Sequence, residues 1–195
     1  MARPRRSNPD APPNDVLAAR AAASVLVDRE AVERAIDRQS IALSVELQDR
    51  NPLVLAVMHG GLPYAAALLR RFAFPCELGY LHVGRYGSAT RGGELVWHAT
   101  PSYELSGRTV LIVDDILDRG DTLAAVSDWV SQAGAGEVIT SVLVDKQITT
   151  SRAISTRFAA LACPDRYLFG YGMDFRGYWR NLPDIWVLPS DFEDR

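Results

Sequence analysis

Two adjacent acids and the polar turn behind them are the residues of this sequence best suited to chemistry. Asp114 and Asp115 follow the apolar run 110–113, and the turn behind them contains Asp118, Arg119, Gly120, Asp121 and Thr122. An unbroken apolar run is typical of a central parallel strand that helices cover on both faces. Ligands of open α/β sheets bind beyond the carboxyl ends of such strands. The acids are therefore predicted to line a binding site.

The polar turn has the features of a phosphate cradle. Leu123, Val126 and Val130 recur at helical spacing, which predicts a helix that begins near Asp121. The first backbone N–H groups of a helix have no partner within it, and a glycine such as Gly120 lets a ligand approach them closely. The turn lacks the spacing of a P-loop and of an EF-hand loop, so neither a nucleoside triphosphatase nor a calcium site is favoured.

Other elements must position this site. A helix is predicted from the N-cap Asp28 to Asn51 and Pro52, with apolar residues on one face. The run 53–58 predicts a buried strand that leads into a Gly60-Gly61 turn, which is a second candidate anion site, and then a helix over 63–71. Further strands are predicted over 77–83, 94–98 and 138–144, with Lys146 just past the last one. The glycine-rich stretch 84–93 is predicted to be a mobile loop.

Composition limits the function classes. The 195 residues carry a net charge of −3, and the two cysteines and three histidines are scattered. No apolar run reaches the ~18 residues of a membrane span, and neither a disulfide framework nor a zinc site is favoured, which makes the cytoplasm the default location. Residues 1–14 are proline-rich without the apolar core of a secretory signal, so we expect a mobile tail. Residues 15–195 then form a single domain with its core at about 50–165.

Two motifs carry a resemblance to a known family. Residues 110–122 have four apolar residues, two acids, two apolar residues and Asp-x-Gly-x-Thr, which resembles the phosphoribosyl diphosphate signature of type I phosphoribosyltransferases. Residues 164–183 resemble the C-terminal region of the purine enzymes of that family, most of all hypoxanthine-guanine phosphoribosyltransferases. The resemblance covers most of residues 53–183. It implies the type I phosphoribosyltransferase fold, an α/β fold with a mostly parallel central sheet flanked by helices and a small hood built from the N-terminal and C-terminal segments.

The resemblance also implies roles for individual residues. Asp118 would be the catalytic base, and ribose and its 5-phosphate would be bound by Asp114, Asp115, Asp118, Arg119, Gly120, Asp121 and Thr122. Diphosphate would contact His59, Gly60 and Arg180, and the purine would contact Lys146, Tyr167, Leu168 and Asp174. Mg²⁺ would be held at Asp114, Asp115 and Asp174, and a lid would contain Arg85 and Tyr86. The Met58–His59 peptide bond would be cis, while His59 and Arg85 depart from the residues common in the family.

The implied reaction is purine salvage. Phosphoribosyl diphosphate and hypoxanthine or guanine would give IMP or GMP and diphosphate, with Mg²⁺ as cofactor, in a homodimer or homotetramer without nucleic-acid or membrane partners. Two alternatives remain open. A xanthine or dual-specificity enzyme would need only a different donor near Leu168 and Asp174. A regulatory RNA-binding protein that keeps the phosphoribosyl diphosphate loop would present a basic face, which the pI near 5.6 does not favour.

Overall fold

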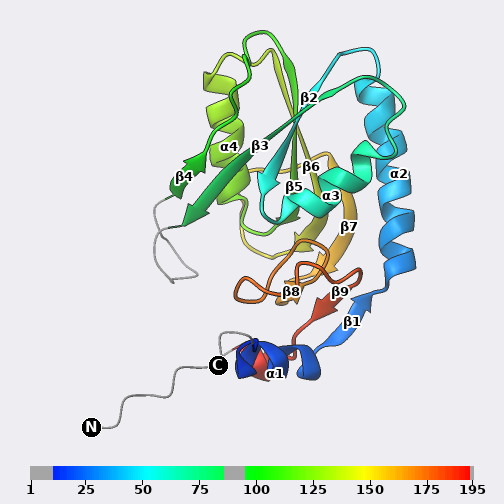
Figure 1. Ribbon diagram of the computed structural model, residues 1–195, viewed down its shortest axis with the longest axis vertical. Coiled ribbons are helices and arrows are strands. Elements are labelled where there is room, and N and C mark those ends of the chain that lie inside the picture. Colours follow the sequence, from blue (N-terminus) through cyan, green and yellow to red (C-terminus); the bar gives the residue numbers. More distant parts are fainter. Residues whose placement is uncertain (1–10, 86–94, 194–195) are drawn as a thin grey trace.

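The main body of the protein is a six-stranded sheet (Figure 1). The structure is a computed structural model that describes residues 11–85 and 95–193. The strand order is β4-β3-β2-β5-β6-β7, in which β4 is antiparallel to β3 and the other neighbouring strands are parallel. The strands are β2 (Leu53–Met58), β3 (Glu77–Arg85), β4 (Leu95–Ala99), β5 (Thr109–Leu117), β6 (Glu137–Gln147) and β7 (Phe158–Pro164).

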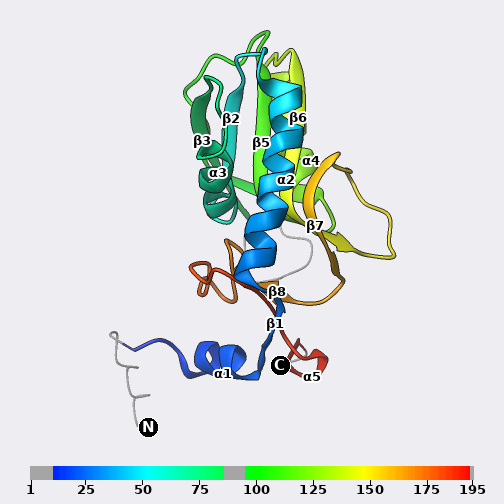
Figure 2. The same ribbon diagram turned by 90° about the vertical axis from the view of Figure 1, so that its right-hand side faces the viewer.

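Helices cover both faces of this sheet (Figures 1 and 2). Helices α2 (Arg29–Leu47) and α3 (Gly61–Leu69) lie on one face, and α4 (Asp121–Gln132) lies on the other. Alternate residues of β5 explain this arrangement: Leu111 and Val113 pack with α2 and α3, whereas Val110 and Ile112 pack with α4. Side chains of a strand alternate between its faces, so an unbroken apolar run can serve two helical layers. Within the described ranges, no helix is long and apolar enough to cross a membrane.

A second, smaller sheet lies beyond one end of the first (Figure 2). Its antiparallel strands have the order β1-β9-β8, with β1 (Ser24–Val27), β8 (Leu168–Phe169) and β9 (Ile185–Val187). Helices α1 (Asn14–Ala22) and α5 (Ser190–Glu193) accompany it. Val16 and Ala19 of α1 pack with Phe169, Phe175 and Leu188 in a separate apolar cluster. The N-terminal and C-terminal segments are thus joined in one small subdomain, as expected for the hood of the predicted fold.

Element positions agree with the sequence, but several boundaries differ. The carboxylate of Asp28 accepts a hydrogen bond from Ala31 N at 2.8 Å and begins α2, as predicted. Helix α3 begins at Gly61, two residues before the predicted start at Pro63. Pro63 fits in the first turn because the backbone N–H groups there have no hydrogen-bond partner within the helix, so a proline removes none. Of the predicted tail, residues 1–10 lie outside the described residues, and α1 already begins at Asn14.

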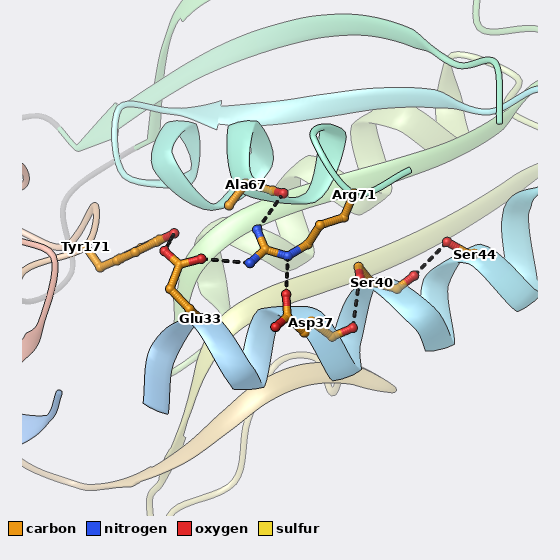
Figure 3. A network of polar contacts seen from close by, with 7 residues as sticks. All are labelled: Glu33, Asp37, Ser40, Ser44, Ala67, Arg71 and Tyr171. Carbon is orange, nitrogen blue, oxygen red and sulfur yellow. Dashed lines mark hydrogen bonds and ion pairs between the residues drawn. The ribbon is translucent and has the colours of Figure 1, made fainter. Parts of the chain in front are cut away.

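Helices α2 and α3 are joined by a polar network around Arg71 (Figure 3). Its guanidinium donates to Asp37 at 2.6 Å, to Glu33 at 2.7 Å and to the carbonyl of Ala67 at 3.0 Å. The Tyr171 hydroxyl donates to the other oxygen of Glu33 at 3.5 Å. The network therefore also connects these helices to the loop that follows β8.

Candidate active site

The carboxyl ends of three neighbouring parallel strands bring the predicted site together. Leu117 of β5 is in register with Asp145 of β6, and Lys146 of β6 is in register with Cys163 of β7. Asp118 and Lys146 therefore lie at the same edge of the sheet. The expectation that Asp114, Asp115 and Lys146 follow their strands was wrong, because pairing with neighbouring strands continues to Leu117 in β5 and to Gln147 in β6.

Asp114 and Asp115 are buried side by side, with 8% and 9% of their surfaces exposed. Burial raises the pKa of Asp114 well above its usual value, and the neighbouring Asp115 raises it further. Burial also raises the pKa of Asp115, while Arg180 opposes that rise. The Asp115 backbone N–H donates to the Asp114 carboxylate at 2.9 Å. Keeping both carboxylates charged in this buried position therefore costs free energy, and a bound cation would reduce that cost.

Two glycines allow the loops to close on Asp115. A Cβ atom at Gly60 would lie 1.9 Å from Asp115 Oδ2, and one at Gly172 would lie 2.1 Å from the carbonyl oxygen of Gly60. Gly172 also has a φ of +101°, which side chains rarely allow. The Met58–His59 peptide bond before the Gly60 turn is cis, as the resemblance implied. Glycine is thus required on both sides of the acid.

Arg180 lies between Asp174 and the acid pair. Its Nη2 atom is 2.6 Å from Asp174 Oδ1, and its Nη1 atom is 3.8 Å from Asp115 Oδ2. Nη1 also donates to the carbonyl of Gly172 at 2.6 Å. Asp174 further accepts from Gly177 N at 2.6 Å, in a tight turn. One guanidinium therefore contacts two carboxylates, and its charge also opposes the rise in the pKa of Asp114.

The polar turn behind β5 has the predicted helix start. Gly120 adopts a φ of +85° and precedes α4, which begins at Asp121 with Thr122 in its first turn. Gly120 is packed against Ile154, and the carbonyl of Arg119 accepts from Ala153 N at 3.2 Å. The loop between β6 and β7 thus supports the turn that leads into the N-terminus of α4, a position in a helix that favours anions.

The three histidines form a row, although they are scattered in the sequence. The His59 and His82 ring centroids lie 4.5 Å apart, and those of His82 and His98 lie 4.7 Å apart. Burial lowers the pKa of His82, and His59 and His98 lower it further. No group of three or more His, Cys, Asp or Glu side chains in the described ranges could by itself hold a metal ion. Of the two predicted lid residues, Arg85 ends β3, and Tyr86 lies outside the described residues.

A pocket opens at this edge of the sheet. Tyr167 lies on one wall, donates its hydroxyl to the carbonyl of Asp174 at 3.2 Å and meets Phe175 edge to face. Lys146 is only 8% exposed, and its Nζ atom lies 3.2 Å from Asp118 and 3.0 Å from Asp165. The residues that line the pocket are Asp115, Ile116, Asp118, Lys146, Arg166, Tyr167, Leu168, Met173 and Asp174.

Comparison with known proteins identifies the family of this chain. The family model of the phosphoribosyl transferase domain matches residues 23–175. The chain belongs to this family. The hypoxanthine-guanine phosphoribosyltransferase of Bacillus subtilis (strain 168) is 31% identical to it over 171 residues, which are 87% of this chain and 95% of that protein.

Other phosphoribosyltransferase relatives differ in length. The bifunctional protein TilS/HprT of Listeria innocua is 32% identical over 168 residues, or 86% of this chain, but the chain spans only 26% of the length of that relative. A solved hypoxanthine-guanine-xanthine phosphoribosyltransferase structure matches with a TM-score of 0.77 and 25% identity, over 86% of this chain and 97% of that one. These matches confirm the predicted type I phosphoribosyltransferase fold.

The carboxylates of the candidate site suit Mg²⁺. Mg²⁺ prefers oxygen ligands and is usually bound by one or two carboxylates together with substrate phosphates and water. Asp114, Asp115 and Asp174 supply only carboxylate oxygens, and Arg180 offsets a single one of their charges. A partial set of protein ligands near the N-terminus of α4 fits such a shared metal site.

Three residues near the pocket were missed by sequence reasoning. Asp165 pairs with Lys146, and Arg166 lines the pocket. Both lie in the segment 164–183 that resembles the family, directly before Tyr167, and this position could have predicted that they lie near the pocket. Arg152 pairs with Asp145 and donates to the carbonyl oxygens of Lys146 and Leu117. No motif contains Arg152, and its role depends on how the loop between β6 and β7 folds back.

Proposed function

We propose that this chain transfers the 5-phosphoribosyl group from phosphoribosyl diphosphate to hypoxanthine or guanine, giving IMP or GMP and diphosphate. The observation that carries the proposal is the buried ammonium of Lys146 in a pocket with an aromatic wall. A buried donor favours a purine with an oxygen at position 6 and leaves a 6-amino purine without a partner. The names of the Bacillus subtilis relative and of the similar solved structure support the same substrate class.

The phosphoribosyl diphosphate would be held from two sides. Its 5-phosphate would accept hydrogen bonds from the turn formed by Arg119, Gly120, Asp121 and Thr122, at the N-terminus of α4. Its ribose hydroxyls would donate to Asp114 and Asp115, and its diphosphate would be bound by His59, Gly60 and Arg180. When bound at Asp114, Asp115 and Asp174, Mg²⁺ would neutralise the charge that develops on the leaving diphosphate.

The purine would be fixed by stacking and by its edges. Tyr167 would stack on one face, the Leu168 backbone and Asp174 would bind the edge opposite Lys146, and Lys146 would donate to the oxygen at position 6. As the bond between the anomeric carbon and diphosphate breaks, N9 would form the new bond to that carbon. Asp118 would take the proton from N7 as positive charge develops on the ring. Holding both reactants in this geometry supplies much of the rate acceleration.

The deciding experiment is a steady-state assay with phosphoribosyl diphosphate and Mg²⁺ against hypoxanthine, guanine, xanthine and adenine. We expect turnover of the first two. Dominant turnover of xanthine would favour the alternative to which the hypoxanthine-guanine-xanthine enzyme points, and Arg166 at the pocket wall is then the donor to examine. Absence of turnover with all four bases would contradict the proposal, and salt-dependent RNA binding would then be the next measurement.

We also infer the organisation of the working protein. Residues 15–195 act as one domain, with a catalytic core at about 50–165 and a hood that supplies Tyr167, Leu168, Asp174 and Arg180. We further infer a cytoplasmic homodimer or homotetramer, which light scattering at several protein concentrations would distinguish from a monomer.

A further inference from the structure

Lys146 is shared by two acids that come from different strands. Asp118 follows β5 and Asp165 follows β7, while Lys146 lies near the end of β6 between them. The ammonium lies 3.2 Å from Asp118 Oδ2 and 3.0 Å from Asp165 Oδ1. The Lys146 side chain is 10% exposed, whereas the Asp118 and Asp165 side chains are 52% and 56% exposed. A buried cation is thus held from the rim by two partly solvated anions.

These two acids differ in their relation to the pocket. Asp118 lines it, and Asp165 does not. If Asp118 accepts a proton from the purine, its lone pairs must be free of Lys146 at that moment, since a carboxylate bonded to an ammonium is a weaker proton acceptor. The ammonium must at the same time reach the purine oxygen. If Asp118 were the only carboxylate beside Lys146, the buried ammonium would lose its charge partner when it moved to the purine, at a large cost in free energy.

We propose that Asp165 is the positioning residue that permits this exchange. It keeps Lys146 paired while the ammonium turns from Asp118 to the 6-oxo group, and so it sets affinity for 6-oxopurines without touching them. This inference rests on the proposed function of the pocket. Strand pairing supports this role. Gln147 at the end of β6 is in register with Pro164 of β7, so the backbone itself places Asp165 beside the end of β6.

The test compares Asp165→Asn, Asp165→Glu and the matched control Glu137→Gln. Glu137 is an ion-paired acid of similar exposure at the other end of β6, where it contacts Arg50. For Asp165→Asn we expect KM for hypoxanthine and guanine to rise roughly fivefold to twentyfold, the value of one partly screened charge-assisted hydrogen bond. KM for phosphoribosyl diphosphate should change by less than about twofold, and Asp165→Glu should restore most of the purine affinity.

A double-mutant cycle with Lys146→Met separates positioning from a structural effect. If Asp165 acts through Lys146, Asp165→Asn should change purine KM by less than about twofold in the Lys146→Met background. Three results would overturn the inference. The first is an equal rise in KM for the purine and for phosphoribosyl diphosphate, and the second is a fall in Tm well beyond that of Glu137→Gln. The third is an undiminished effect of Asp165→Asn on purine KM in the Lys146→Met background. The wild-type enzyme is assayed first: absence of its turnover contradicts the proposed function itself, whereas normal wild-type turnover with an unchanged Asp165→Asn contradicts only the role of Asp165.

Discussion

Replacing Asp118 by asparagine should separate catalysis from binding and stability. The amide oxygen can still accept a hydrogen bond from Lys146, and Asp165 remains 3.0 Å from the ammonium. Because Asp118 is 52% exposed, loss of its charge should cost less than about 1 kcal/mol of folding free energy. An amide cannot take the N7 proton, however, and loss of a positioned base lowers rates by ~10²–10⁴-fold, or about 2.7–5.4 kcal/mol in the barrier.

The assay follows IMP formation from hypoxanthine at saturating phosphoribosyl diphosphate and Mg²⁺. Rapid-quench single-turnover measurements should accompany it, because product release can limit kcat and hide a slower chemical step. KM for hypoxanthine should change little, and Tm should stay within about 3 °C of the wild type. Asp128→Asn, an exposed acid on α4 away from the pocket, is the control.

A single-turnover rate for Asp118→Asn within about threefold of the wild type would refute the assignment. So would a rise in KM that accounts for the whole loss of kcat/KM, because Asp118 would then contribute only to binding.

Three further changes test packing and charge, two of them in the candidate site and one in the network around Arg71. Gly60→Ala should lower kcat/KM by roughly 10²-fold, because the new Cβ would lie 1.9 Å from Asp115 Oδ2; steady-state kinetics measure this. Burial raises the pKa of Asp114 in the folded protein above the pKa of about 3.9 that aspartate has in an unfolded chain. The free energy of unfolding therefore falls as the pH rises from the lower pKa through the higher one. In EDTA, Asp114→Asn should therefore have a higher Tm than the wild type at pH 7, and thermal unfolding should show this gain disappear toward pH 3. Arg71→Met should lose about 1 kcal/mol and roughly 2–4 °C in Tm with kinetics preserved, whereas Arg34→Met, at an exposed pair with Glu30, should lose less than about 0.5 kcal/mol.

Local sequence features were sufficient for the core of the fold. The apolar run 110–113, the glycine turns and the N-cap Asp28 each determine their element through short-range physics, and β5, α3, α4 and α2 lie where they were expected. Strand ends were less predictable. A strand continues as long as its neighbours offer hydrogen-bond partners, and β6 extends the pairing of β5 past the two acids to Leu117. The charged side chains of Asp114 and Asp115 had predicted that β5 ends before them, but hydrogen bonding to β6 extends the strand to Leu117.

Pairings across the site could not be read from the sequence. Lys146 follows an apolar run by one residue, a position where lysine is ordinarily solvated, yet it is buried because two other strand ends converge on it. His59, His82 and His98 are likewise brought into one row only by the pairing of β3 with β2 and β4. Such contacts depend on strand order, which a motif does not state.

The distribution of charge explains why these long-range pairings matter for the proposed reaction. Asp115 and Asp174 share the Arg180 guanidinium beside Asp114, and Asp118 and Asp165 share the Lys146 ammonium. Under the proposed function, Mg²⁺ would bind beside the first cluster, and the purine would transfer a proton to Asp118 in the second. Both clusters would then stabilise the transition state more than the bound substrates, because diphosphate departs and the purine loses its proton only as that state forms.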